Sequence, residues 1–122
     1  MIYLASPYSH PDPVVRNQRF EEVCRLAATL MAQGKHVFSP IAHTLPIALH
    51  GNLPTGWDYW ESLDRFWIGV CDEVIAMMLD GWRESVGVRA EIAIARELGK
   101  PVTYFTPRKN ETLFGLRSEK VV

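Results

Sequence analysis

Two acidic residues stand on predicted helices at positions where the surrounding pattern is apolar. The neighbours of Glu91 three and four positions away are small or apolar, and Asp64 lies between Trp60 and Trp67 at the same spacing. A carboxylate on such an inward stripe loses hydration, so it needs a compensating partner or a chemical use. Two inward carboxylates on separate elements suit acid–base or nucleophilic chemistry on a sugar. The alternative for each is structural: a glutamate paired with an arginine, and an aspartate that caps a loop.

A candidate anion site precedes Glu91 on the same predicted helix. Ser85 opens this helix, and Gly87 would let a ligand approach its backbone N–H groups closely. Arg16 and Arg19 stand near the start of the first predicted helix, within reach of the same anion. The alternatives remain open: Ser85 is a plain N-cap, and the arginines lie on a solvated face.

Other polar and aromatic residues fall near the expected site with weaker signals. Ser6 and Tyr8 follow the first strand and form a second candidate cradle, although it lacks glycines. His43 follows the second strand and either lines the site or is a structural or solvent-exposed histidine. Trp57 and Trp82 either serve the core or an oligomer contact, or stack on a base.

Composition narrows the classes of partner and cofactor. The 122 residues carry 13 basic and 14 acidic side chains without a dense basic block, which argues against a nucleic-acid polymer as partner. A mononucleotide needs only one or two cations. The two cysteines show neither Cys-x-x-Cys spacing nor a Cys/His cluster, so no metal site and no organic cofactor are expected. No apolar run approaches the roughly 20 residues of a membrane span, so we expect no membrane partner and a cytoplasmic location.

Strand-like and helical patterns alternate along the chain. Apolar runs predict strands over residues 2–5, 36–39, 74–79 and 101–105, and 3.6-residue spacing predicts helices over residues 13–33, 57–70 and 85–98. Residues 41–56, with two prolines and two glycines, are expected to be irregular with one short helix around Ile47.

This alternation predicts a doubly wound α/β domain over residues 1–106 with a parallel sheet ordered about 2-1-3-4. Ligands of such sheets bind beyond the carboxyl ends of the strands. The site is therefore expected between residues 6–9, the loop after Ser39, and the segment from Asp80 into the last helix. Residues 107–122 form a polar tail, which we expect to contact a neighbouring subunit.

The segment from Asp72 to Glu91 resembles the nucleoside 2-deoxyribosyltransferase superfamily. It reads DEVIAMMLD, then SVGVRAE, and it closes on LGKPV at residues 98–102. The resemblance implies a small flavodoxin-like domain in which Glu91 is the nucleophile. It also implies that Asp64 is a second active-site carboxylate and that the hydroxyl of Tyr3, in the first strand, positions the glutamate. Asp80 belongs to the acidic turn of this signature and is expected to line the ligand site.

Ser85 stands six residues before the nucleophile, where transferases acting on free nucleosides tend to carry aspartate. The similar 5′-monophosphate N-glycosidases have serine there, so the resemblance implies cleavage or transfer at the N-glycosidic bond of a nucleoside 5′-monophosphate. Two alternatives stay open: a non-catalytic nucleotide-binding or sensing domain, and a deoxyribosyltransferase acting on free nucleosides. The resemblance also implies a homo-oligomer, a dimer or tetramer, in which Asn110 is a provisional counterpart of an asparagine that completes a neighbour's site.

Overall fold

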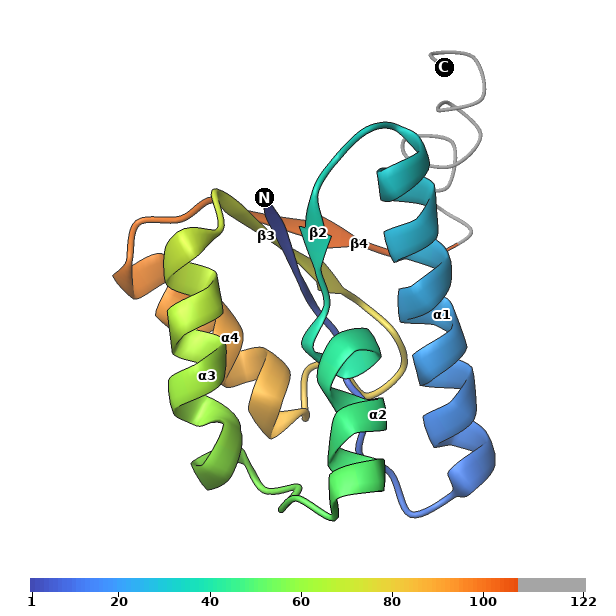
Figure 1. Ribbon diagram of the computed structural model, residues 1–122. Coiled ribbons are helices and arrows are strands. Elements are labelled where there is room, and N and C mark those ends of the chain that lie inside the picture. Colours follow the sequence, from blue (N-terminus) through green and yellow to red (C-terminus); the bar gives the residue numbers. More distant parts are fainter. Residues whose placement is uncertain (108–122) are drawn as a thin grey trace.

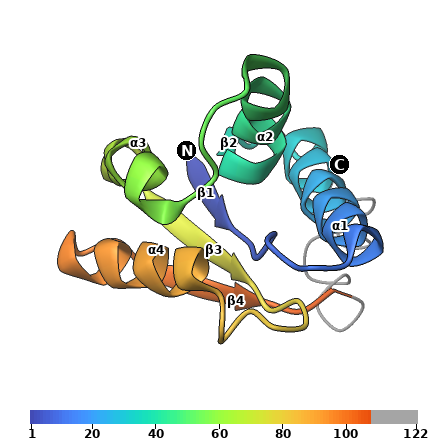
Figure 2. The ribbon, with the colours of Figure 1, turned by 90° about the horizontal axis from the view of Figure 1, so that it is seen from below.

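The computed structural model describes residues 1–107, which form a parallel sheet with helices on both faces (Figures 1 and 2). Four strands pair in the order β2-β1-β3-β4, as predicted from the sequence. Within the described residues the strands are β1 Ile2–Ala5, β2 Val37–Phe38, β3 Glu73–Met77 and β4 Val102–Phe105. The helices are α1 Pro13–Ala32, α2 Pro40–Gly51, α3 Trp57–Val70 and α4 Val86–Glu97. The predicted tail contact and Asn110 concern residues outside the described part, apart from Pro107.

The side chains of β1 alternate between the two faces of the sheet. Ile2 and Leu4 pack with α1, whereas Tyr3 and Ala5 pack with residues of α3 and α4. Figure 2 shows α1 on one side of the sheet and α3 with α4 on the other. Because β1 pairs with β2 on one edge and β3 on the other, it is buried throughout. Because side chains of a strand alternate between its two faces, Tyr3 points toward α3 and α4, the helices that carry Asp64 and Glu91.

The first helix follows the predicted start and stop signals. The carboxylate of Asp12 accepts a hydrogen bond from the N–H of Val14 at 2.9 Å, and Pro13 occupies the first turn. Gly34, at φ +84°, lies just beyond the helix, where a left-handed conformation ends it without steric cost.

The expectation for residues 41–56 was partly right: a helix is present around Ile47, but α2 is a continuous helix of 12 residues, and only the residues after it are irregular. Ser39 is its N-cap and accepts from the N–H of Ala42 at 3.1 Å. Pro40 closes β2 and also occupies the first turn of α2, where its missing N–H costs nothing. Pro46 lies inside the helix and removes a single backbone hydrogen bond, a loss that the packed helix tolerates.

The helices α3 and α4 bury their acidic residues together with apolar neighbours. The buried residues of α3 are Asp64 and Ile68, and those of α4 include Glu91 and Ile92. None of the helices in residues 1–107 is long and apolar enough to cross a membrane.

Arg19 joins two loops that lie at the carboxyl ends of the strands. Its guanidinium donates to the carbonyl of Ser9 at 2.9 Å and to that of Asp80 at 2.6 Å. These carbonyls belong to the loops after β1 and β3. Gly81, at φ +86°, lies against the same guanidinium, and a Cβ there would come within 2.7 Å of Nη2.

Gly81→Ala tests whether Arg19 holds this turn. The substitution strains the backbone and pushes the guanidinium away from Asp80, whereas Gly99→Ala, at φ +71°, carries only strain because a Cβ there meets nothing within 4 Å. We expect losses in the free energy of unfolding of about 2 kcal/mol for Gly81→Ala and about 1 kcal/mol for Gly99→Ala, measured by urea denaturation. The difference should vanish in an Arg19→Ala background. A difference that persists there would contradict the link.

Candidate functional site

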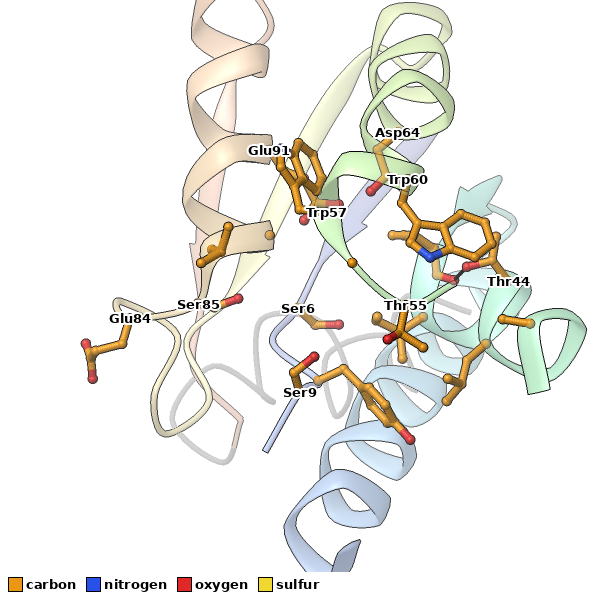
Figure 3. A pocket seen from close by; sticks show the side chains of 18 residues that line it. Ser6, Ser9, Thr44, Thr55, Trp57, Trp60, Asp64, Glu84, Ser85 and Glu91 are labelled. Atoms are coloured by element: carbon orange, nitrogen blue, oxygen red, sulfur yellow. Dashed lines mark hydrogen bonds between the residues drawn. The ribbon is translucent and has the colours of Figure 1, made fainter. Parts of the chain in front are cut away.

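A cavity of about 520 Å³ lies at the carboxyl ends of the strands. The loop after β1, the helix α2, the start of α3 and the start of α4 surround it. Figure 3 shows the side chains that line it. Its size falls in the range of small-molecule sites, which is about 300–1,000 Å³.

Two carboxylic acids and one phenol form the innermost part of the site. Glu91 is 4% exposed and Asp64 6%, and both line the cavity. Tyr3 lies beneath them, fully buried, and its hydroxyl donates a hydrogen bond to Oε2 of Glu91 at 2.5 Å. The carboxyl of Asp64 lies near both groups and raises the pKa of each. We call these three residues the acidic cluster.

Burial decides the protonation of the acidic cluster. It raises the pKa of Glu91 well above its usual range, and the charge of Asp64 raises it further, while the Tyr3 hydroxyl opposes the shift. Burial also raises the pKa of Asp64, against hydrogen bonds from Glu91 and Tyr3. The pKa of Tyr3 is raised well above its usual value by burial and by both carboxylates. The phenol therefore stays protonated and remains a donor, and both carboxyls hold a proton to higher pH than exposed carboxyls do.

Hydroxyl groups gather at the opening of α4. Ser85 is its N-cap, and its Oγ accepts from the N–H of Val88 at 3.2 Å while the residue also lines the cavity. Ser6 and Ser9 face the same space from the loop after β1 (Figure 3). Ser6 is 6% exposed, and its Oγ has no hydrogen-bond partner among the described residues. An unpartnered buried hydroxyl is costly, so this one is available to a ligand.

The side of the cavity that α2 and α3 form is apolar and aromatic. The helix α2 contributes Ile41, Leu45 and Ala48, and the start of α3 contributes Trp57 and Trp60. Among the described residues that line the cavity there is no lysine or arginine. Its charged residues are the two carboxylic acids and Glu84, whose side chain points away from the serine hydroxyls in Figure 3.

The structure brings most of the predicted site residues together. Six of them line the cavity, and Tyr3, which lies beneath the lining, donates a hydrogen bond to Glu91, one of the six. The six are Ser6, Tyr8, Asp64, Ser85, Gly87 and Glu91.

Besides Tyr3, four predicted site residues do not line the cavity. Arg16 of α1 donates to the carbonyls of His10 and Pro11 in the loop before that helix, and Arg19 links the two loops described above. The backbone carbonyl of Asp80 accepts a hydrogen bond from Arg19. His43 is exposed on α2, with its ring 5.3 Å from that of Phe38.

Sequence patterns gave little indication of the apolar side of the cavity. Trp57 is one of the two tryptophans considered for stacking on a base, and it lines the cavity, whereas Trp82 packs near Tyr104 instead. The sequence indicated the segment after Ser39 as part of the site, but it did not indicate that this segment is helical or that Trp60 lines the cavity. The signal for this helix is Ser39-Pro40, an N-cap followed by a first-turn proline.

No group of three or more His, Cys, Asp or Glu residues in positions 1–107 is arranged to hold a metal ion. Comparison with curated proteins gives no significant match. The matching family model does not name the nucleoside 2-deoxyribosyltransferases. The chain belongs to the family described as "Domain of unknown function (DUF1937)", whose model matches residues 1–106.

Proposed function

We propose that this protein cleaves the N-glycosidic bond of a nucleoside 5′-monophosphate, with Glu91 as the nucleophile. The observation that carries the proposal is the buried Glu91, held by Tyr3 and facing Asp64 at the inner end of a nucleotide-sized cavity. Resemblance of the segment from Asp72 to Glu91 to the nucleoside 2-deoxyribosyltransferases supports the sugar as the site of attack.

The proposed reaction has two steps, as in retaining glycosidases. Ionised Glu91 attacks C1′, the C1′–N bond breaks with its electron pair going to the base, and a glycosyl ester forms. The proton held by Asp64 goes to the leaving nitrogen, so the base departs neutral. Water then attacks the ester at C1′, releasing the sugar phosphate and Glu91, and its second proton returns to Asp64. Tyr3 donates to Glu91 and so favours its ionised form over the protonated one.

The phosphate is proposed to lie at the start of α4. The N–H groups of Val86 and Gly87 belong to the first helical turn, where no helical carbonyl precedes them, and the helix dipole favours an anion there. The hydroxyls of Ser6, Ser9 and Ser85 face the same space. In this proposal neutral donors hold the phosphate, and Arg16 and Arg19 shape the loops around it.

Two observations favour the alternatives. The raised pKa of Glu91 keeps it protonated in the empty cavity over part of the pH range, which suits a nucleotide-binding domain without turnover. The absence of lysine and arginine from the described lining suits a neutral nucleoside, as in transfer between free nucleosides. Both alternatives make predictions that differ from ours in a single panel of substrates.

Glu91→Ala should abolish release of free base. We expect wild-type protein to release base from nucleoside 5′-monophosphates faster than from free nucleosides, measured by chromatography, and Glu91→Ala to lose about 10⁴-fold or more. Glu97→Ala is the matched control, because this glutamate is exposed on the same helix. Base release that survives Glu91→Ala would exclude Glu91 as nucleophile. Binding without release would favour the non-catalytic alternative, and a preference for free nucleosides would favour transfer.

Glu91→Gln should stabilise the protein at neutral pH. Because the folded-state pKa of Glu91 is raised above its ordinary 4.5, the folded protein holds a proton that the unfolded chain releases, and stability falls as pH rises above about that value. A neutral amide removes this dependence. We expect a flatter pH profile and a gain of roughly 1–3 kcal/mol at pH 8 in urea denaturation. Parallel profiles for the two proteins would contradict it, and Glu97→Gln should follow wild type.

Gly87→Ala should separate fold stability from phosphate binding. A Cβ at Gly87 would meet only Oγ of Ser85, at 4.0 Å, so the fold accommodates it and α4 gains about 0.5–1 kcal/mol in helix propensity. The added methyl narrows the approach to the first-turn N–H groups. We expect a higher melting temperature together with about tenfold weaker binding of nucleoside 5′-monophosphates in calorimetry.

Gly69→Ala is the control for this prediction. Gly69 lies exposed in α3 with nothing within 4 Å of a Cβ, so alanine should stabilise its helix similarly and leave binding unchanged. Equal binding by wild type and Gly87→Ala would place the phosphate elsewhere.

A further inference from the structure

We infer that the apolar wall of the cavity binds the leaving base by stacking and apolar contact, without recognising the hydrogen-bonding edge of that base. By the apolar wall we mean the cavity-lining residues of α2 together with Trp60 of α3, with Ile41, Leu45 and Trp60 as its main members. Trp57 is not part of it, because Figure 3 shows its ring toward Glu91 and not beside Trp60. The inference rests on the proposed function, because it assigns one part of the proposed substrate to this wall.

The acidic cluster and the serine hydroxyls are assigned to other parts of the substrate, so the apolar wall is the part of the cavity that can contact the base. The acidic cluster must lie at C1′, and the serine hydroxyls and the start of α4 are proposed to hold the phosphate. In Figure 3 Trp60 and Thr44 lie on the opposite side of the cavity from Ser85. A nucleotide whose phosphate lies at Ser85 and whose C1′ lies at Glu91 therefore directs its base toward α2. Aromatic rings such as that of Trp60 favour a flat base.

The two side-chain donors on this wall, those of Trp60 and Thr44, already have partners within the protein. Nε1 of Trp60 donates to the carbonyl of Pro54 at 2.8 Å. The hydroxyl of Thr44 donates to the carbonyl of Pro40, one turn earlier in α2. Each of these groups has one proton to give, so neither can donate to an acceptor on the base.

Two hydroxyls remain, and neither is fixed in direction. Thr55 is exposed and Tyr8 is half-buried, and no hydrogen bond to another described residue holds either hydroxyl. A hydroxyl both donates and accepts, and it rotates to suit its partner. These two groups therefore accommodate an amino or a keto group alike and do not discriminate between them.

Discrimination between bases should consequently be weak. Sites built on fixed buried hydrogen bonds reject an analogue that lacks the matching group by about 10⁴–10⁵-fold, whereas apolar pockets discriminate by about 10–200-fold. The purine bases have similar stacking area and differ mainly at their edges. We therefore expect adenine, guanine, hypoxanthine and unsubstituted purine to be bound with affinities within about tenfold of one another when carried on the same ribose 5′-phosphate.

The test measures binding with turnover removed. Full-length Glu91→Gln protein is titrated calorimetrically with the four purine ribonucleoside 5′-monophosphates and with ribose 5-phosphate, which has no base. The four nucleotides should bind within about tenfold of one another, and ribose 5-phosphate should bind at least about tenfold more weakly. A spread above about 10³-fold among the four would overturn the inference, and so would equal binding of ribose 5-phosphate.

Substitutions of Trp60 test whether the apolar wall provides the affinity for the base. Trp60→Leu should weaken the binding of all four nucleotides by about the same factor, near tenfold, and leave the binding of ribose 5-phosphate unchanged. Trp60→Phe keeps a ring without the N–H, so it should retain most of the affinity and also covers the case in which leucine disturbs the fold. Trp82→Leu, outside the cavity, is the matched control and should bind as the parent protein does. A loss confined to one base would contradict stacking without edge recognition.

Failure of the inference and failure of the proposed function give different results. Base release by the wild-type protein that depends on Glu91, combined with strong preference for one purine, overturns the inference and keeps the function. Similar binding of the four nucleotides without any base release keeps the inference and overturns the catalytic function. Absence of binding by all four nucleotides overturns both.

Discussion

The burial of two carboxylic acids beside one phenol is the constraint on which the rest of the structure depends. Glu91 and Asp64 come from different helices, and Tyr3 comes from the strand beneath them. The Tyr3 hydroxyl satisfies part of the hydrogen-bonding requirement of Glu91, and an isolated buried carboxylate would cost several kcal/mol. The sheet register that directs Tyr3 toward α3 and α4, and the packing of these two helices against each other, are therefore parts of one arrangement.

Aromatic packing keeps this arrangement rigid. The ring of Tyr3 lies 5.8 Å from that of Phe38, and Phe38 stacks on Trp67 with 4.4 Å between centroids and 11° between planes. Trp67 belongs to α3, the helix that also carries Asp64. The phenol and the aspartate are thus fixed by a common aromatic stack, so their hydroxyl and carboxyl do not need to be ordered when a ligand arrives. Such preorganisation lowers the cost of binding and of charge development.

The sequence predicted the sheet order and the position of the acidic cluster because these depend on strong, local patterns. Continuous apolar runs indicated the inner strands, and Glu91 and Asp64 stood out as charges on apolar stripes. The arginines were harder to place, since a side chain with that reach has many acceptors, and Arg16 and Arg19 bind loop carbonyls in the structure. The helix α2 was predicted only as a short helix around Ile47, since a proline such as Pro46 usually interrupts a helix. Its contribution to the cavity depends on tertiary packing, which no local pattern reports.

The helix α2 is attached to the sheet through β2, a strand of two residues at the edge. Tyr3, Asp64 and Glu91 all lie outside α2, so the acidic cluster and the part of the cavity lining that α2 contributes lie on separate parts of the chain. Substitutions in α2 can therefore accumulate without disturbing the protonation of the buried acids. Under the proposed function, such separation would let related chains change the molecules they accept by remodelling one peripheral helix while the buried acids stay in place.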